Sequence, residues 1–166
     1  WPKANPPAYT GDYELALNQI LPDGVFTDQC GEPVRLHDLT GTYFVLEAAA
    51  LDCTPCQEAS AGIEDFKTNM ANAGIDVVVA TLMAPGIYDS EGMVSQASIE
   101  DWASTFEMDS PVLVDRGWVK SMVGRYNGDW VGFPTTILVA PNLEVFKVHT
   151  GFAGWEENED AIQNHH

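Results

Sequence analysis

The sequence predicts a three-layer α/β domain, in which helices cover a central and mostly buried sheet. Apolar runs alternate along the chain with segments in which apolar residues recur at helical spacing. Several of the runs are continuous, which is typical of strands covered on both faces. With 166 residues, of which 45% are hydrophobic, the chain is long enough for one domain with a substantial core.

Residues 1–20 are expected to form a leader outside the domain, which would span residues 21–164. The proline-rich segment Trp1–Pro7 predicts a semi-rigid extended stretch, either a tether or a disordered terminus. The chain begins with Trp1 rather than Met, so we expect that a preceding segment was removed. A short helical pattern covers residues 13–20, and His165-His166 resembles the remnant of a purification tag.

A hairpin is expected to open the domain, because Gly24–Thr27 and Pro33–Leu36 flank a short turn. A turn or single helical turn follows. Further strands are expected at the apolar or alternating runs 43–50, 75–80, 111–114, 135–140 and 144–150. Helical spacing predicts helices at 53–73, 98–106, 118–126 and 155–163, and a long loop at 83–92.

The chemistry is expected at Cys53-Thr54-Pro55-Cys56, directly after the buried run 43–50. If a helix opens at Cys53, Cys56 lies one turn further on the same face, within the Cα spacing that a disulfide tolerates. The free N–H groups and the dipole of that helix would favour a thiolate at Cys53. The pair is therefore predicted to cycle between dithiol and disulfide.

Two other interpretations of the cysteine pair stay open. It could be a structural disulfide, although a bridge over so short a loop constrains the unfolded chain little. It could be half of a zinc site, but further ligands at short spacing are missing, since Cys30, His37 and His149 are isolated in the sequence. Cys30 itself is expected to be either a buried free thiol or an intermolecular or regulatory thiol.

Glu47 is the exception within the buried run 43–50. A buried carboxylate is costly unless it is paired or protonated, so its position predicts a role. Because Glu47 precedes Cys53 by six residues, an extended segment and a turn could bring it beneath Cys56. The alternative is that Glu47 points to a solvated edge of the sheet.

The charge of the chain argues against several partners. Its 25 acidic and 7 basic residues give a net charge of −18, which repels nucleic acid and anionic membrane surfaces. Such a charge serves solubility or attracts basic or unfolded client proteins. No apolar run approaches the roughly 20 residues of a membrane span.

These residues together resemble the thioredoxin superfamily: a strand, Cys53-Thr54-Pro55-Cys56 at a helix start, and Gly132-Phe133-Pro134-Thr135 before a hairpin. The N-terminal hairpin and the run from Pro111-Val112-Leu113-Val114-Asp115 to Pro141-Asn142 are similar to its TlpA/ResA-type branch. The resemblance covers residues 21–163. It implies a thioredoxin-like α/β/α domain with a mixed sheet and an N-terminal hairpin extension. It also implies an exported thiol–disulfide oxidoreductase that faces the periplasm or cell surface, either free or tethered to the membrane, and that needs no cofactor.

The resemblance also implies roles for individual residues. Cys53 would be the exposed attacking thiolate and Cys56 the buried resolving partner. Glu47 stands where cytosolic thioredoxins keep a buried aspartate that relays a proton for the second cysteine. Pro134 would follow a cis peptide bond and lie against the disulfide. The residues that flank the cysteines and this proline are expected to contact client proteins: Thr54, Pro55, Phe133 and Thr135.

Asp52 departs from the family pattern, which commonly has Trp before the first cysteine. Its negative charge would disfavour the neighbouring thiolate. A peroxiredoxin would need Pro-x-x-x-Thr/Ser-x-x-Cys, whereas Leu46 and Ala50 fill those places ahead of Cys53. Client protein thiols and an upstream thiol redox partner are the expected partners, with reduction of clients as the expected direction.

The rival from another class is a binding module that docks partners and turns nothing over. Trp118, Trp130 and Phe133 could form an apolar docking face near the cysteines. Two thiolates also suit Cu(I), although no histidine or methionine motif completes such a site. No metal is therefore expected.

Overall fold

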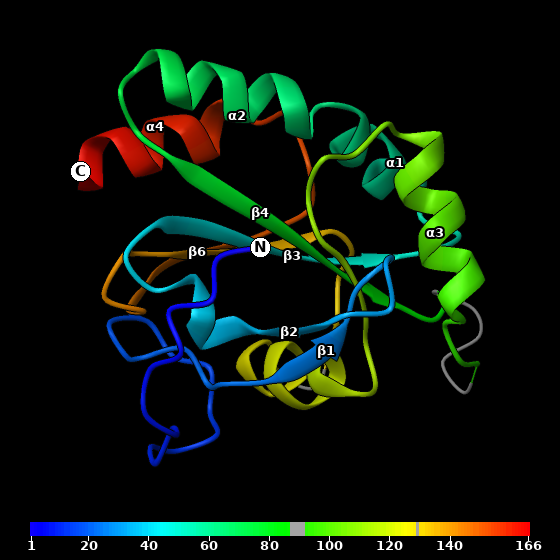
Figure 1. Ribbon diagram of the computed structural model, residues 1–166, viewed down its shortest axis with the longest axis horizontal. Helices are drawn as coiled ribbons and strands as arrows, with labels where there is room; N and C mark the ends of the chain where they lie inside the picture. The colour runs from blue at the N-terminus through cyan, green and yellow to red at the C-terminus, as the bar shows by residue number, and fades with distance from the viewer. Residues whose placement is uncertain (87–91, 129) are drawn as a thin grey trace.

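The computed structural model describes residues 1–86, 92–128 and 130–166. Within them, one mixed sheet has the strand order β5-β4-β3-β6-β7 (Figure 1). Its strands are β3 Tyr43–Ala50, β4 Val77–Ala84, β5 Val112–Val114, β6 Thr135–Val139 and β7 Val145–Thr150. The central strand β3 runs parallel to β4 and antiparallel to β6, which confirms the predicted α/β class with a mixed sheet.

Different elements cover the two faces of the sheet. Four helices lie over one face: α1 Thr54–Ala61, α2 Ile63–Asn72, α3 Gln96–Thr105 and α4 Glu156–His165. The other face carries the predicted hairpin of β1 Val25–Thr27 and β2 Pro33–Arg35, together with η1 Leu36–Leu39 and a helical segment around η2 Lys120–Gly124 (Figure 1). The predicted three layers are therefore present.

The strand β3 is buried along its whole length, as its apolar run predicts. Its side chains alternate between two core clusters because successive residues of a strand point to opposite faces. Val45 and Ala49 belong to the cluster under the four helices, whereas Leu46 and Ala48 belong to the cluster under the hairpin. The alternation therefore places Glu47 on the helix-covered face.

The single helix expected at 53–73 is wrong, because the structure has two helices separated at Gly62. The indole Nε1 of Trp155 donates a hydrogen bond to the carbonyl oxygen of Ala59 at 2.9 Å. A Cβ atom on Gly62 would lie 2.9 Å from Cδ1 of the same indole. The Ala59 carbonyl, which would accept from the Ile63 amide in a continuous α-helix, thus accepts from Trp155 and from the Gly62 amide where α1 ends.

Residues 13–20 do not form the helix that their pattern indicates. Their backbone instead joins the sheet edge, where Asn18 N–H donates to the Val145 carbonyl and Val145 N–H donates to the Gln19 carbonyl. The helix expected from Ser98 begins earlier, at Gln96, because the Ser95 side chain caps it by accepting from the Ser98 amide. Of the loop expected at 83–92, residues 87–91 lie outside the described part of the chain.

The leader lies along the hairpin rather than apart from it. The Trp1 indole donates to the Asp28 carboxylate, and the Arg35 guanidinium donates to the carbonyl of Pro6 at 2.7 Å. The boundary at residue 20 stays a prediction. His165, which resembles a tag residue, is the last residue of α4, and its Nδ1 lies 3.0 Å from the Tyr43 hydroxyl. Among the described helices, none combines the length and apolarity that crossing a membrane requires.

Candidate active site

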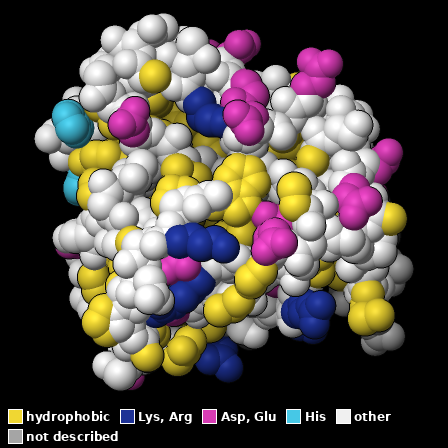
Figure 2. All heavy atoms as spheres, in the orientation of Figure 1, with side chains coloured by type: hydrophobic (Ala, Val, Ile, Leu, Met, Phe, Trp, Pro, Cys, Tyr) yellow, Lys and Arg dark blue, Asp and Glu magenta, His cyan; other side chains and the backbone are white. Residues whose placement is uncertain are grey.

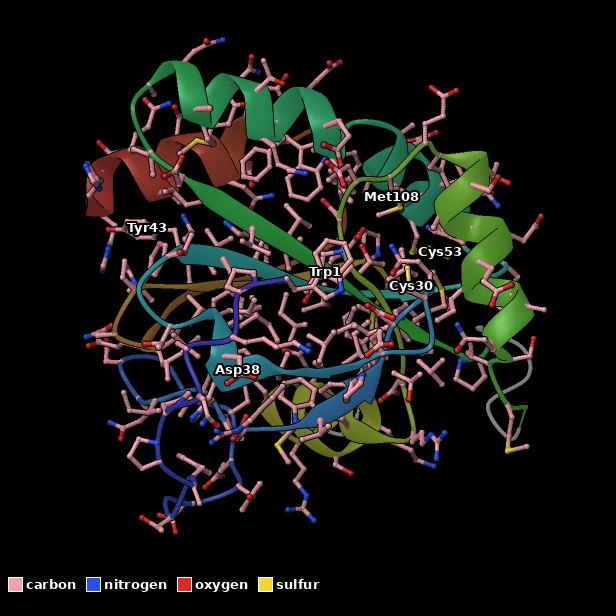
Figure 3. The ribbon with its side chains drawn as sticks, viewed as in Figure 1. Trp1, Cys30, Asp38, Tyr43, Cys53 and Met108 are labelled. Atoms are coloured by element: carbon pink, nitrogen blue, oxygen red, sulfur yellow. A yellow bond between two sulfur atoms is a disulfide. The ribbon has the colours of Figure 1, made fainter. Side chains whose placement is uncertain are left out.

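Cys53 and Cys56 form a disulfide at the start of α1, with their Cα atoms 5.2 Å apart. Figure 3 shows Cys53 at the end of β3 opposite to Tyr43, close to where the chain enters α1. The helix begins here because Cys53 is its N-cap and Pro55 stands in the first turn, where a missing N–H does no harm. The two cysteines therefore form the disulfide that their spacing predicts.

The backbone of α1 directs a hydrogen-bond donor at the first sulfur. The Cys56 amide N–H donates to Cys53 Sγ at 3.2 Å. In the reduced protein such a donor, together with the helix dipole, would stabilise a thiolate at Cys53. Thr54 and Pro55, between the two cysteines, are exposed to solvent.

The expectation that Cys53 is exposed is wrong for the disulfide form. Only 1% of its surface is accessible, and Cys56 is fully buried. The Cys53 sulfur turns inward because it caps α1, and it belongs to the same apolar cluster as Ala50 and Met83. Exchange at this disulfide therefore requires a movement that uncovers the sulfur.

The Phe133–Pro134 peptide bond is cis, as the resemblance implies. Since Thr135 pairs with Ala48, the next position of the antiparallel ladder places Pro134 opposite Ala49, near the cysteine end of β3. The Thr135 side chain is buried and donates from its hydroxyl to the Gly132 carbonyl, so it is not available for client contact. Phe133 is partly exposed.

Glu47 is completely buried, which excludes the solvated-edge alternative. Its Oε2 accepts a hydrogen bond from the Thr81 hydroxyl at 2.8 Å, while its Oε1 has no partner among the described residues. Burial raises the pKa of Glu47 to about 7, against the smaller lowering effect of the Thr81 hydrogen bond. The carboxyl can therefore take up and release a proton near neutral pH.

A row of polar side chains that was not predicted from the sequence crosses the helix-covered face at the level of Glu47. Thr81 and Thr136 are the register partners of Glu47 on its two sides, and His149 is the partner of Thr136. Asn158 of α4 reaches Thr136 from above, with 3.4 Å between Oδ1 and Oγ1. In the sequence, the feature that could have indicated this row is a polar residue inside each apolar strand.

A cavity of about 790 Å³ borders Phe133 at the carboxyl ends of β4 and β5. Its walls include the apolar side chains of Val114 and Val119, and Arg116 and Lys120 also line it. Acidic side chains are scattered over the face shown in Figure 2, with fewer basic ones among them. The cavity is therefore a partly apolar hollow whose charged lining residues are Asp115, Arg116 and Lys120.

Asp52 packs against the backbone at Gly86, where a Cβ atom would lie 2.9 Å from its Oδ2. Cys30 is a free and exposed thiol, so the interpretation as a buried thiol is wrong. It lies in the tight turn between β1 and β2, where its side chain faces solvent.

The residues of the rival interpretations have different surroundings in the structure. The Trp118 ring packs edge-on against Phe26, with centroids 6.4 Å apart, whereas Trp130 is 60% exposed. His37 is buried, and its Nε2 lies 2.6 Å from the Leu21 carbonyl oxygen. Within the described ranges, no three His, Cys, Asp or Glu side chains are grouped to hold a metal ion.

The AhpC/TSA family model matches residues 17–148. Thiol-disulfide oxidoreductase ResA of Halalkalibacterium halodurans is 23% identical over 138 residues, which cover 83% of this chain and 68% of that protein.

Two solved structures are also similar. The thioredoxin domain of a thiol-disulfide oxidoreductase from Bacteroides vulgatus has a TM-score of 0.70 at 16% identity, covering 91% of this chain and 98% of that one. An exposed lipoprotein thioredoxin of Streptococcus pneumoniae has a TM-score of 0.56 at 27% identity, covering 87% and 97%. These matches confirm the thioredoxin-like fold and the ResA-type resemblance. Because the family model matches most of the length of this chain, the chain belongs to the AhpC/TSA family.

Proposed function

We propose that this protein is a thiol–disulfide oxidoreductase that reduces disulfides of client proteins through a mixed disulfide with Cys53. The observation that carries the proposal is the Cys53–Cys56 bridge at the start of α1, with a buried carboxyl group, Glu47, on the same face of the sheet. The naming of the curated relative as a thiol-disulfide oxidoreductase supports it.

The proposed cycle moves two electrons from the dithiol to the client. The Cys53 thiolate attacks one sulfur of a client disulfide, and the other client sulfur leaves as a thiolate that takes a proton from water. Cys56 then loses its proton to Glu47 and attacks Cys53. The bond between Cys53 and the client breaks, the client leaves as its second thiolate, and the Cys53–Cys56 disulfide is formed. A partner protein with a dithiol returns the enzyme to its reduced state.

Client chains would approach the exposed Thr54 and Pro55 on one side and, on the other, the partly exposed Phe133 that precedes the buried Pro134. The cavity beside Phe133 is large enough to receive apolar side chains of an unfolded segment. Thr135 would contribute through its position in the backbone next to Pro134 rather than through its side chain.

We place this activity outside the cytoplasm, with a tether upstream of the chain. Stable disulfide chemistry belongs to oxidising compartments, and the similar streptococcal structure is named an exposed lipoprotein. Labelling intact cells with an impermeant thiol reagent tests the location, since Cys30 is exposed and would react only on an extracytoplasmic protein.

The activity is tested by reduction of insulin with dithiothreitol as electron donor. The wild type should accelerate precipitation of insulin, and Cys53→Ser should fall to the uncatalysed rate because the mixed disulfide cannot form. Cys30→Ser, which removes the exposed cysteine outside the motif, is the matched control and should match the wild type. Equal rates for the wild type and Cys53→Ser would end the catalytic proposal and favour the binding module, with which the buried Cys53 sulfur is also compatible.

A further inference from the structure

We propose that His149 is a relay residue that carries the proton of Glu47 to solvent through the site occupied by Thr136. The inference rests on the proposed function, since it concerns the proton that Cys56 releases during resolution of the mixed disulfide. It adds a route for a proton that would otherwise stay on a carboxyl group buried from bulk solvent.

The first support is the alignment of three side chains on one face of the sheet. Glu47 pairs in register with Thr136, and Thr136 pairs with His149 on the edge strand β7. Neighbouring strands lie about 4.8 Å apart, so the backbones of Glu47 and His149 are separated by roughly 10 Å with Thr136 between them. The contacts of Thr136 and His149 with α4 show that both point to the helix-covered side, as Glu47 does.

The second support is that two buried polar atoms in this row lack hydrogen-bond partners among the described residues. They are Oε1 of Glu47 and Nε2 of His149. Buried polar groups are rarely left unsatisfied, and an internal water molecule commonly joins such groups. A water molecule between them would have three polar partners in Glu47 Oε1, His149 Nε2 and the Thr136 hydroxyl, which is enough to hold it.

The third support is the chemical state of the imidazole. Nδ1 of His149 lies 3.4 Å from Oε2 of Glu157 on α4, which favours a proton on Nδ1 and leaves Nε2 as an acceptor. Burial lowers the pKa of His149, as does the charge of Lys147 on the same strand, while Glu157 raises it. A neutral imidazole with its acceptor nitrogen inside and its other nitrogen beside a surface carboxylate is suited to pass a proton outward.

In the proposed step the Cys56 thiol first gives its proton to Glu47 in a reversible transfer. Before the thiolate attacks Cys53, the carboxyl group passes this proton to Nε2 of His149, through the bridging water or the Thr136 hydroxyl, so that Cys56 stays deprotonated and the rate of resolution depends on the relay. The imidazolium releases its Nδ1 proton at the surface beside Glu157, and the tautomers are restored by exchange with water. No electrons are transferred in the relay, and Glu47 returns to the carboxylate needed for the next turnover.

The test follows formation and decay of the mixed disulfide between the reduced enzyme and a disulfide-containing peptide, by stopped flow in weak buffer. For His149→Gln we expect resolution to slow roughly tenfold, less than the ~10²-fold expected from losing the general base itself. Attack at Cys53 should keep its wild-type rate, and added imidazole buffer should restore resolution. His165→Gln removes a histidine that contacts Tyr43 instead and should behave as the wild type.

Thr136→Val tests the connection independently. It should slow resolution as His149→Gln does, and the double variant should be no slower than either single one, because both interrupt one route. If resolution is slow in Glu47→Gln but has the wild-type rate in His149→Gln, the relay through His149 is overturned and Glu47 remains the base. A defect in His149→Gln that imidazole does not rescue would also overturn it, as structural damage. A wild-type rate of resolution in Glu47→Gln would instead show that Glu47 is not the base. The insulin assay tests the proposed oxidoreductase activity separately.

Discussion

Replacing Glu47 with glutamine should change how the stability of the oxidised protein depends on pH. The buried carboxyl group has a pKa of about 7, compared with its ordinary value of 4.5. The folded protein therefore binds this proton more tightly than the unfolded chain does. The resulting stability is fully present below pH 4.5 and is lost as the pH rises through about 7.

The size of the effect follows from these two values. Their difference is about 2.5 pH units, which at 1.36 kcal/mol per unit corresponds to about 3 kcal/mol. Glu47→Gln removes the titrating group but keeps an oxygen that can accept from the Thr81 hydroxyl. We therefore compare the free energy of unfolding of the variant with that of the wild type. The variant's value minus the wild-type value should be about 3 kcal/mol larger at alkaline pH than at acidic pH.

The assay is urea unfolding of both proteins with the disulfide intact, at about pH 5 and about pH 9. Other titrating groups contribute equally to both proteins and cancel in the comparison. Glu58→Gln, which removes an exposed carboxyl group from α1, is the matched control and should not reproduce the change. A stability difference that stays constant between the two pH values would refute the reasoning, because it would mean that Glu47 is not buried with a raised pKa.

Two further outcomes test the packing. In the folded oxidised protein, Ellman's reagent should titrate the Cys30 thiol rapidly, and Cys30→Ser should abolish the reaction, since the other two cysteines are in the disulfide. Gly62→Ala should lower the free energy of unfolding by about 1–3 kcal/mol, because its Cβ would press against the buried Trp155 ring. Gly74→Ala is the control at another helix end, where there is open space for a Cβ atom. The positive φ of Gly74 would still lower the free energy of unfolding of this variant, but the fluorescence of Trp155 should stay unchanged.

The strands and the cysteine motif could be predicted because their signals are local. The continuous apolar run 43–50 predicts a buried central strand, and Cys53 and Cys56 are joined as their spacing indicates. Glu47 stands out in the sequence for the same reason, as a charge among apolar residues. Residues 13–20 show the limit of such patterns, since their helical spacing is overridden by backbone pairing with β7.

The site is completed by contacts that no local pattern describes. The row from Thr81 through Glu47 and Thr136 to His149 exists only because four strands pair in one register. His149 is isolated in the sequence, and its relation to Glu47 depends on the position of β7 at the edge of the sheet. Predicting this row would have required the strand order and the pairing of residues far apart in the chain.

The amino-acid sequence alone established the α/β class, the reactive cysteine pair and the unusual carboxyl group, because periodicity and motif spacing are properties of neighbouring residues. The tertiary structure decided that Cys53 is covered, that the first helix breaks at Gly62 and that Cys30 is exposed. Each of these depends on which distant surface a residue packs against. The Trp155 indole, for example, bonds to the Ala59 carbonyl although 96 positions separate the two residues, with β4, β5, β6 and β7 between them in the chain.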